Sequence, residues 1–135
     1  MTPGTPAVTA SATIGETQSV SYSRHVADGE LQQFQTEEFE DWLRKLRDRQ
    51  AKFRILQRID RLMHGNPGDV APVGEGVSEL RMHFGPGYRV YFLQDRDILI
   101  VLLAGGDKST QQADIEKAHE LANQWREEQK NNGKR

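Results

Sequence analysis

The sequence of 135 residues contains no cysteine, which excludes disulfide bonds, thiolate zinc sites and a cysteine nucleophile, and favours a reducing compartment. It also has no long apolar run, because the longest, residues 98–104, is far shorter than the roughly 18 residues that cross a bilayer. We therefore expect a soluble, cytoplasmic protein without a membrane segment. The length and a hydrophobic content of 36% suit one globular domain.

The first thirty residues contain few large apolar side chains and lack the apolar segment of a secretory signal. Serine and threonine alternate there with small residues, a composition that does not bury enough surface to offset its own ordering entropy. We predict a flexible Ser/Thr-rich tail over residues 1–30 and a folded domain over residues 31–135.

Local signatures of cofactor chemistry are weak. The histidines lack the spacing of metal ligands, and no Ser/His/Asp arrangement has a local signature. Residues 105–110 resemble the end of a phosphate-binding P-loop, but its first glycine is missing because position 102 is leucine. The sequence therefore predicts neither a metal site nor a nucleotide cofactor.

Positive charge is concentrated in one segment, although the formal net charge of the chain is only −2. Residues 44–61 hold eight basic side chains against two acidic ones, a local net charge of +6. A solvated helix face and a binding surface for a polyanion both account for such a segment. As candidates for RNA binding we take Arg47, Lys52, Arg54, Arg58 and Arg61.

The middle of the chain predicts two helices in succession. After a short strand around residues 31–35, Thr36 can cap a helix whose first turn is acidic. Apolar residues recur at helical spacing over residues 39–46, and again over residues 51–62. Because the link between these stripes is short, we expect an antiparallel αα-hairpin that ends at the turn of residues 65–68.

From residue 77 the apolar period changes to two, which indicates strands. Residues 77–84 and 88–93 form a predicted hairpin, and residues 98–104 form a strand buried on both faces. A capping box at Ser109 opens a last helix, whose apolar stripe runs from Ile115 to Trp125. The predicted order is (β)ααβββα, an α+β domain in which the αα-hairpin and the C-terminal helix pack with a small antiparallel sheet.

The predicted hairpin brings side chains suited to a phosphodiester onto one open sheet face. If Gly-Pro-Gly forms a three-residue loop, His83 faces Arg89 and Arg81 faces Tyr91, on the side opposite the apolar core. Arginine binds phosphate in a bidentate manner, tyrosine stacks on bases, and histidine titrates near neutrality. Ordinary surface ion pairs, such as Arg81 with Glu79, account for these residues equally well.

Six segments with consistent spacing carry a resemblance to a known family. They are Phe39-x-x-Trp42-Leu43, Arg58-Ile59-Asp60-Arg61-Leu62, Gly65-Asn66-Pro67-Gly68-Asp69, Gly74-Glu75-Gly76-Val77-x-Glu79-Leu80-Arg81, Gly85-Pro86-Gly87-Tyr88-Arg89-Val90-Tyr91 and Leu102-Leu103-x-Gly105-Gly106-Asp107-Lys108-x-Thr110-Gln111-x-x-Asp114-Ile115. From about residue 31 to residue 126, the chain resembles the addiction-module killer proteins of the RelE/ParE type II toxin superfamily, in its HigB/RelE-like form.

The resemblance implies a bacterial or phage toxin with a curved antiparallel sheet and a last helix that an antitoxin influences or displaces. The antitoxin is usually a small helix-turn-helix protein, and operator DNA is bound through it. RelE-like members cut mRNA at the ribosome, whereas ParE-like members inhibit DNA gyrase. Arg81 matches the strand arginine that RelE-like nucleases use on the scissile phosphate, and Lys108 matches a basic residue after the last strand. The late tyrosine of RelE has no counterpart, because its place falls near Asp114.

We accordingly expect a ribosome-associated mRNA interferase, in which the 2′-hydroxyl of the mRNA attacks the adjacent phosphate without a metal or other cofactor. Arg81, Arg89 and Lys108 would hold the phosphate. Tyr91 or His83 would stack on a base or transfer a proton, and the basic helices would bind ribosomal RNA. A non-catalytic gyrase inhibitor and an RNA-binding module without catalysis are the alternatives.

Overall fold

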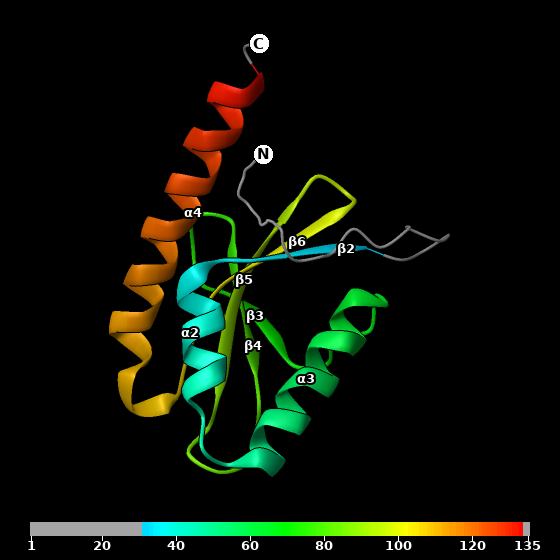
Figure 1. Cartoon of the computed structure of the whole chain (residues 1–135), viewed down its shortest axis with the longest axis vertical. Coiled ribbons are helices and arrows are strands. Elements are labelled where there is room, and N and C mark those ends of the chain that lie inside the picture. The colour runs from blue at the N-terminus through cyan, green and yellow to red at the C-terminus, as the bar shows by residue number, and fades with distance from the viewer. Residues whose placement is uncertain (1–30, 134–135) are drawn as a thin grey trace.

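The computed structural model describes residues 31–133, so the tail predicted over residues 1–30 lies outside the described residues (Figure 1). The elements are strand β2 (Gln32–Gln35), helices α2 (Glu37–Lys45) and α3 (Arg49–Met63), strands β3 (Val70–Pro72), β4 (Val77–Arg81), β5 (Arg89–Asp95) and β6 (Leu99–Gly106), the 3₁₀ turn η1 (Lys108–Thr110) and helix α4 (Gln111–Gly133). The predicted α+β class is confirmed.

The strands form one five-stranded sheet in the order β2-β6-β5-β4-β3. The strand predicted around residues 31–35 is present, but it pairs parallel with β6, so the sheet is not wholly antiparallel. Strand β3 was missing from the prediction, because Pro72 and the nearby glycines suggested a loop. A three-residue strand at a sheet edge tolerates proline and is too short to show an alternating pattern.

Local capping signals set the starts of the first two helices. The Thr36 hydroxyl accepts a hydrogen bond of 3.1 Å from the Phe39 N–H, as its sequence position predicted. The Asp48 carboxylate likewise accepts a bond of 3.1 Å from the Ala51 N–H. Residues 46–48 join helices α2 and α3, which run in roughly opposite directions (Figure 1). The predicted αα-hairpin is confirmed.

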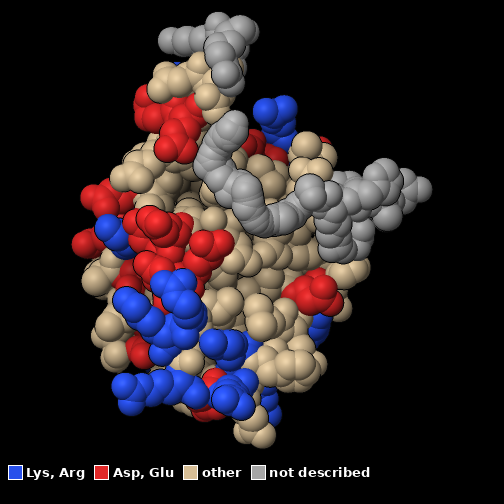
Figure 2. All heavy atoms as spheres, in the orientation of Figure 1, with Lys and Arg blue, Asp and Glu red and all other residues tan. Residues whose placement is uncertain are grey.

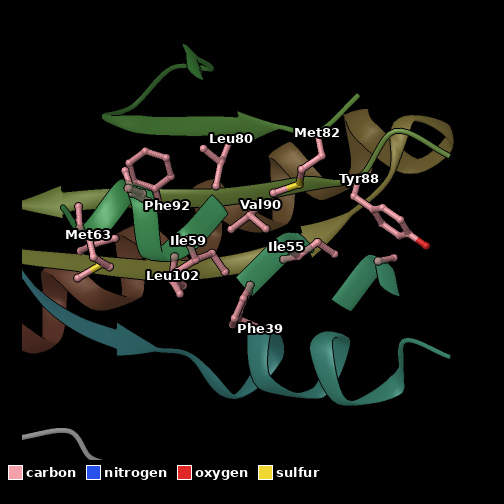
Figure 3. Packing of buried hydrophobic residues seen from close by; sticks show 13 residues of the cluster. Phe39, Ile55, Ile59, Met63, Leu80, Met82, Tyr88, Val90, Phe92 and Leu102 are labelled. Atoms are coloured by element: carbon pink, nitrogen blue, oxygen red, sulfur yellow. The ribbon is translucent and has the colours of Figure 1, made fainter. Parts of the chain in front are cut away.

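The sheet carries an apolar core on each face. Helices α2 and α3 cover one face, where Figure 3 shows Phe39 and Ile55 packed toward Val90 of the sheet. Helix α4 covers the other face, where Ala118 and Ala122 pack with apolar residues of β5 and β6. Strand β6 supplies alternate residues to both cores, as its continuous apolar run predicted. Within residues 31–133, no helix is both long and apolar enough to cross a membrane.

The register between β4 and β5 differs from the predicted one. Arg81 pairs with Arg89 and not with Tyr91. The reason is the position of the turn, which closes through a hydrogen bond of 3.1 Å from the Gly87 N–H to the Phe84 carbonyl. The next bond, of 3.0 Å from the Met82 N–H to the Tyr88 carbonyl, centres the hairpin on residue 85, which is one residue earlier than predicted, so every partner shifts by two. Because this shift is even, each side chain keeps its predicted face of the sheet.

The start of the last helix also differs from the prediction. The capping box lies at Asp107 and not at Ser109, and it opens the short turn η1 ahead of α4. The Asp107 carboxylate accepts a hydrogen bond of 2.8 Å from the Ser109 N–H. The predicted stripe from Ile115 to Trp125 does pack against the sheet, together with Leu121. The covering of this face by α4 decides which polar side chains remain accessible.

Gly105 of β6 lies where α2 approaches the sheet closely. A Cβ atom at this position would be 2.2 Å from Cε3 of Trp42. We expect Gly105→Ala to lower the free energy of unfolding by about 1–3 kcal/mol, because overpacking displaces the indole or the strand. Urea denaturation tests this, with Gln94→Ala at an exposed position of β5 as the control. Equal stability of the two variants would contradict the close approach.

Candidate functional site

The last residues of β4 and β6 and the first residue of β5 lie next to one another at one end of the sheet, where these three strands terminate. Arg81 ends β4 and pairs with Arg89, the first residue of β5, which in turn pairs with Gly106 at the end of β6. Because neighbouring strands lie about 4.8 Å apart, Arg81 and Gly106 are roughly 10 Å apart across the sheet. Lys108 follows in η1, and its side chain packs on the backbone of Gly87. The three cationic residues that the sequence proposed for phosphate binding therefore share this end.

A buried carboxylate lies at the centre of the polar residues beneath α4. Glu79 is completely buried, and its two oxygens accept hydrogen bonds from Nε of Arg81 (3.0 Å), the Tyr91 hydroxyl (3.0 Å) and Nε2 of Gln111 (2.7 Å). Nε of Arg89 lies 3.7 Å from the same carboxylate. We call these five residues, which come from β4, β5 and α4, the Glu79 cluster.

The prediction that Arg89 and Tyr91 point to an open groove is wrong. Helix α4 lies over this face, so that Tyr91 is completely buried and Arg89 is only 8% exposed. Burial, followed by the Glu79 carboxylate, raises the pKa of the Tyr91 phenol, which stays protonated at neutral pH. With α4 in place, neither side chain reaches an RNA strand. The predicted stacking and phosphate-binding roles of this pair would require α4 to leave the face.

Arg81 is accessible although its neighbour Arg89 is not. Its side chain is 39% exposed, and its bond to Glu79 uses only Nε. Within residues 31–133 the two terminal amino groups of Arg81 make no hydrogen bond. The hydrogen bond to Glu79 raises the pKa of the guanidinium, which keeps its charge. Such a group can take two phosphate oxygens on its free edge.

His83 lies just beyond β4 and does not face Arg89 as predicted. Its side chain is 70% exposed, and Nε2 contacts the carboxylate of Asp69, which precedes β3. The hydrogen bond from His83 lowers the pKa of Asp69, and the charge of Arg81 acts in the same direction. An imidazole is therefore accessible at the same end of the sheet as Arg81. No cluster of three or more His, Asp or Glu side chains among the described residues is arranged to hold a metal ion.

Part of the basic segment lies at this end of the molecule. Figure 2 shows lysine and arginine side chains gathered over the lower end, where α2 passes into α3. Arg47 and Arg54 are exposed there, and Lys52 is half-buried. The guanidinium of Arg54 lies 4.9 Å from the ring centre of Phe84, which joins the start of α3 to the β4–β5 loop.

The two other predicted RNA-binding residues stand apart. Arg58 donates hydrogen bonds from its terminal nitrogens to the carbonyl oxygens of Arg81 (2.6 Å) and Pro67 (2.8 Å), so it holds the backbone around the site. Arg61 is exposed, but it lies in the last turn of α3. At 1.5 Å per residue, that turn is roughly 20 Å along the helix direction from Arg47.

The raised pKa of Tyr91 predicts how the stability of the fold depends on pH in the alkaline range. Above about pH 10 its phenol ionises in the unfolded chain but not in the folded one, so the stability that it supplies below this pH is lost as the pH rises. We expect the Tm of the wild type to fall more steeply between about pH 9 and pH 11 than the Tm of Tyr91→Phe. Thermal unfolding by circular dichroism measures both slopes. Parallel slopes would show that this phenol is not protected.

Comparison with protein-family models matches residues 41–126 to the phage derived protein Gp49-like family (DUF891). The chain belongs to the Gp49-like family. The matched region includes the whole Glu79 cluster and Lys108. The Gp49-like family is a toxin-like, phage-derived family associated with toxin–antitoxin modules, which supports a toxin role and an antitoxin partner for the chain. The predicted kinship with addiction-module proteins is confirmed at this level.

A relative of this Gp49-like chain occurs in Haemophilus influenzae, where it is named an uncharacterized protein. The two sequences are 50% identical over 84 residues, which are 62% of this chain and 85% of the relative. The relative shares most of its length with this chain, and its name assigns it no activity.

The sequence pattern missed the central role of Glu79. It considered Glu79 only as the partner of Arg81 in an ordinary surface ion pair and gave no role to Gln111. The spacing of Glu79 and Arg81 on one strand was a usable signal, because residues two apart share a face. The bond from Gln111 joins residues 32 positions apart, so no local pattern could have indicated it.

Proposed function

We propose that this Gp49-like protein is a toxin that cleaves mRNA on the ribosome. The observation that supports this proposal is the guanidinium of Arg81, which is fixed through Nε and accessible at the same end of the sheet as Lys108. A planar guanidinium fits two phosphate oxygens, and a nearby ammonium group stabilises the negative charge that develops on them. The resemblance of Arg81 and Lys108 to residues of RelE-like nucleases agrees with this assignment.

The cleavage requires no water and no covalent enzyme intermediate. The 2′-hydroxyl oxygen of a nucleotide attacks the adjacent phosphorus while the bond to the 5′-oxygen of the next nucleotide breaks. One proton leaves the 2′-hydroxyl and one reaches the 5′-oxygen, which gives a 2′,3′-cyclic phosphate and a 5′-hydroxyl. We assign proton transfer to His83, because imidazole is a common general acid–base group and this one is exposed beside Asp69. Tyr91 has no part in this step while it is buried.

The basic residues around the α2–α3 link, of which Arg47 and Arg54 are exposed and Lys52 is half-buried, provide the ribosome contact in this proposal. Arg47, Lys52 and Arg54 bind phosphates of ribosomal RNA, while Arg81 and Lys108 take the mRNA phosphate. Arg58 supports the site through its bonds to backbone carbonyls and does not contact RNA.

The test is a translation reaction to which the purified protein is added. New 5′ ends of the messenger are mapped by primer extension, with and without ribosomes, and a DNA gyrase supercoiling assay runs beside it. Discrete cuts that depend on ribosomes are the expected result. An intact messenger would overturn the proposal, and binding to ribosomes without new ends would indicate an RNA-binding module.

A non-catalytic inhibitor of DNA gyrase is the second candidate, and one observation favours it. Phe53 and Leu56 are 61% and 42% exposed and lie on the same side of α3, three residues apart. Exposed aromatic and aliphatic side chains on one helix face are suited to a protein partner. If gyrase inhibition is the function, the double change Phe53→Ala and Leu56→Ala removes toxicity, whereas the Arg81→Ala variant remains toxic. The opposite pattern excludes gyrase inhibition.

A further inference from the structure

We infer that Glu79 is a positioning residue, which orients the guanidinium of Arg81 toward the phosphate that the toxin cleaves. This inference rests on the proposed function, because it concerns the same phosphate. It adds a residue that lies completely beneath α4 and does not touch the RNA.

The two oxygens of the Glu79 carboxylate have separate partners. Oε1 accepts the hydrogen bond from Nε of Arg81, at 3.0 Å. Oε2 accepts one bond from the Tyr91 hydroxyl, at 3.0 Å, and one from Nε2 of Gln111, at 2.7 Å. Neutral donors from β5 and α4 thus hold one oxygen, while the other holds the arginine. These two bonds anchor the carboxylate independently of Arg81, so it can set the direction of the guanidinium.

A gain in stability is by itself a weak reason for a buried carboxylate in this place. Removing a charge from water is costly, and an ion pair under a helix commonly contributes no more stability than apolar residues of the same volume. Here the partner, Arg81, is accessible. The buried carboxylate of Glu79 holds Nε of this arginine, while the terminal amino groups remain open to a ligand. That arrangement suits the binding of a ligand.

The charge of the cluster agrees with an anionic ligand. Two guanidinium groups, from Arg81 and Arg89, face the single carboxylate of Glu79. Among the described residues, Nε of the buried Arg89 has no hydrogen-bond partner. The five residues of the Glu79 cluster therefore carry one excess positive charge, at the end of the sheet where the phosphate is proposed to bind.

Glu79→Gln tests the inference, because the amide keeps the volume of the side chain and loses its charge. We expect the single-turnover rate of mRNA cleavage on ribosomes to fall about 10- to 100-fold, since misplacement of a catalytic group by about 1 Å has an effect of this size. Ribosome affinity should stay within about 3-fold, because the proposed contact residues on the α2–α3 link and on α3 are unchanged. The matched control is Glu75→Gln, at an exposed carboxylate 3.5 Å from Nδ1 of His119.

A double-mutant cycle separates positioning from a structural role. If Glu79 acts only through the Nε of Arg81, then Glu79→Gln should change the rate by less than about 3-fold in an Arg81→Lys background, since lysine has no Nε to hold. Gln111→Ala is a second variant for the case that Glu79→Gln does not fold. It removes one anchor at the start of α4 and should lower the rate several-fold with ribosome affinity retained.

The outcomes distinguish this inference from the proposed function. A wild-type protein that makes no cut overturns both. A wild-type protein that cuts, with Glu79→Gln or Gln111→Ala cutting at the same rate, overturns the positioning role alone. Equal losses from Glu79→Gln in the wild-type and Arg81→Lys backgrounds would show that Glu79 acts independently of Arg81, and would also overturn it.

Discussion

Replacing Arg81 with alanine should abolish the toxicity of this protein and leave its antitoxin binding intact. The change removes the accessible guanidinium at the end of β4, while most of the side chains packed beneath α4 keep their apolar contacts. Loss of one preorganised donor for a developing oxyanion costs about 100- to 1000-fold in rate. Growth arrest on expression without antitoxin, and cleavage in the translation reaction, measure the effect. Lys108→Ala should act in the same direction.

Lys117→Ala is the matched control for this prediction. Lys117 is an exposed cation on α4, with its ammonium 3.6 Å from the Glu120 carboxylate and no contact with the Glu79 cluster. This variant should retain full toxicity. Antitoxin capture and thermal unfolding establish that Arg81→Ala is folded. Toxicity that survives in folded Arg81→Ala would contradict cleavage as the function and would favour the gyrase alternative.

Ribosome binding should weaken about 100- to 500-fold between roughly 50 and 200 mM salt. Five phosphate contacts, each contributing about 0.7–0.9 to the slope of log affinity against log salt, give a slope near −4. The five contacts are the proposed ones, from Arg47, Lys52, Arg54, Arg81 and Lys108. Sedimentation of the protein with ribosomes that carry mRNA, over a salt series, measures the slope.

Removing the positive charges around the α2–α3 link tests which residues produce this slope. Changing Arg47, Lys52 and Arg54 together to glutamine should reduce its magnitude by about 2–3, because three contacts are lost. The rate of cleavage at saturating ribosomes should change little, since these residues do not touch the scissile phosphate. Arg61→Gln is the control, because Arg61 lies in the last turn of α3. An unchanged slope in the triple variant would place the ribosome contact elsewhere.

The helices were predictable because their signals are local. Thr36 caps α2 as its position suggested, and the apolar stripes of α3 and α4 do face the cores. Such patterns require only residues three or four positions apart. Strand β3 and the parallel pairing of β2 escaped prediction, since both depend on a neighbouring strand.

The hairpin was predictable in its faces and not in its register. Alternation assigned Arg81 and Tyr91 to one side of the sheet, and that assignment holds. The pairing depended on where the hairpin closes, and the hydrogen bond from the Met82 N–H to the Tyr88 carbonyl shifts each partner by two residues. An even shift leaves each side chain on the same face of the sheet. The predicted register was therefore wrong, while the predicted faces were right.

The order of residues was enough to establish the α+β class, the two-sided burial of β6 and the common sheet face of Arg81 and Arg89. Folding then settled the accessibility of those residues. Alternation states which side of a strand a residue occupies, but it contains no information on what covers that side. Helix α4 covers it here, which buries Glu79 and Tyr91 and leaves Arg81 at the edge. Contacts between residues 32 positions apart, such as Gln111 with Glu79, arise only when the whole chain packs together.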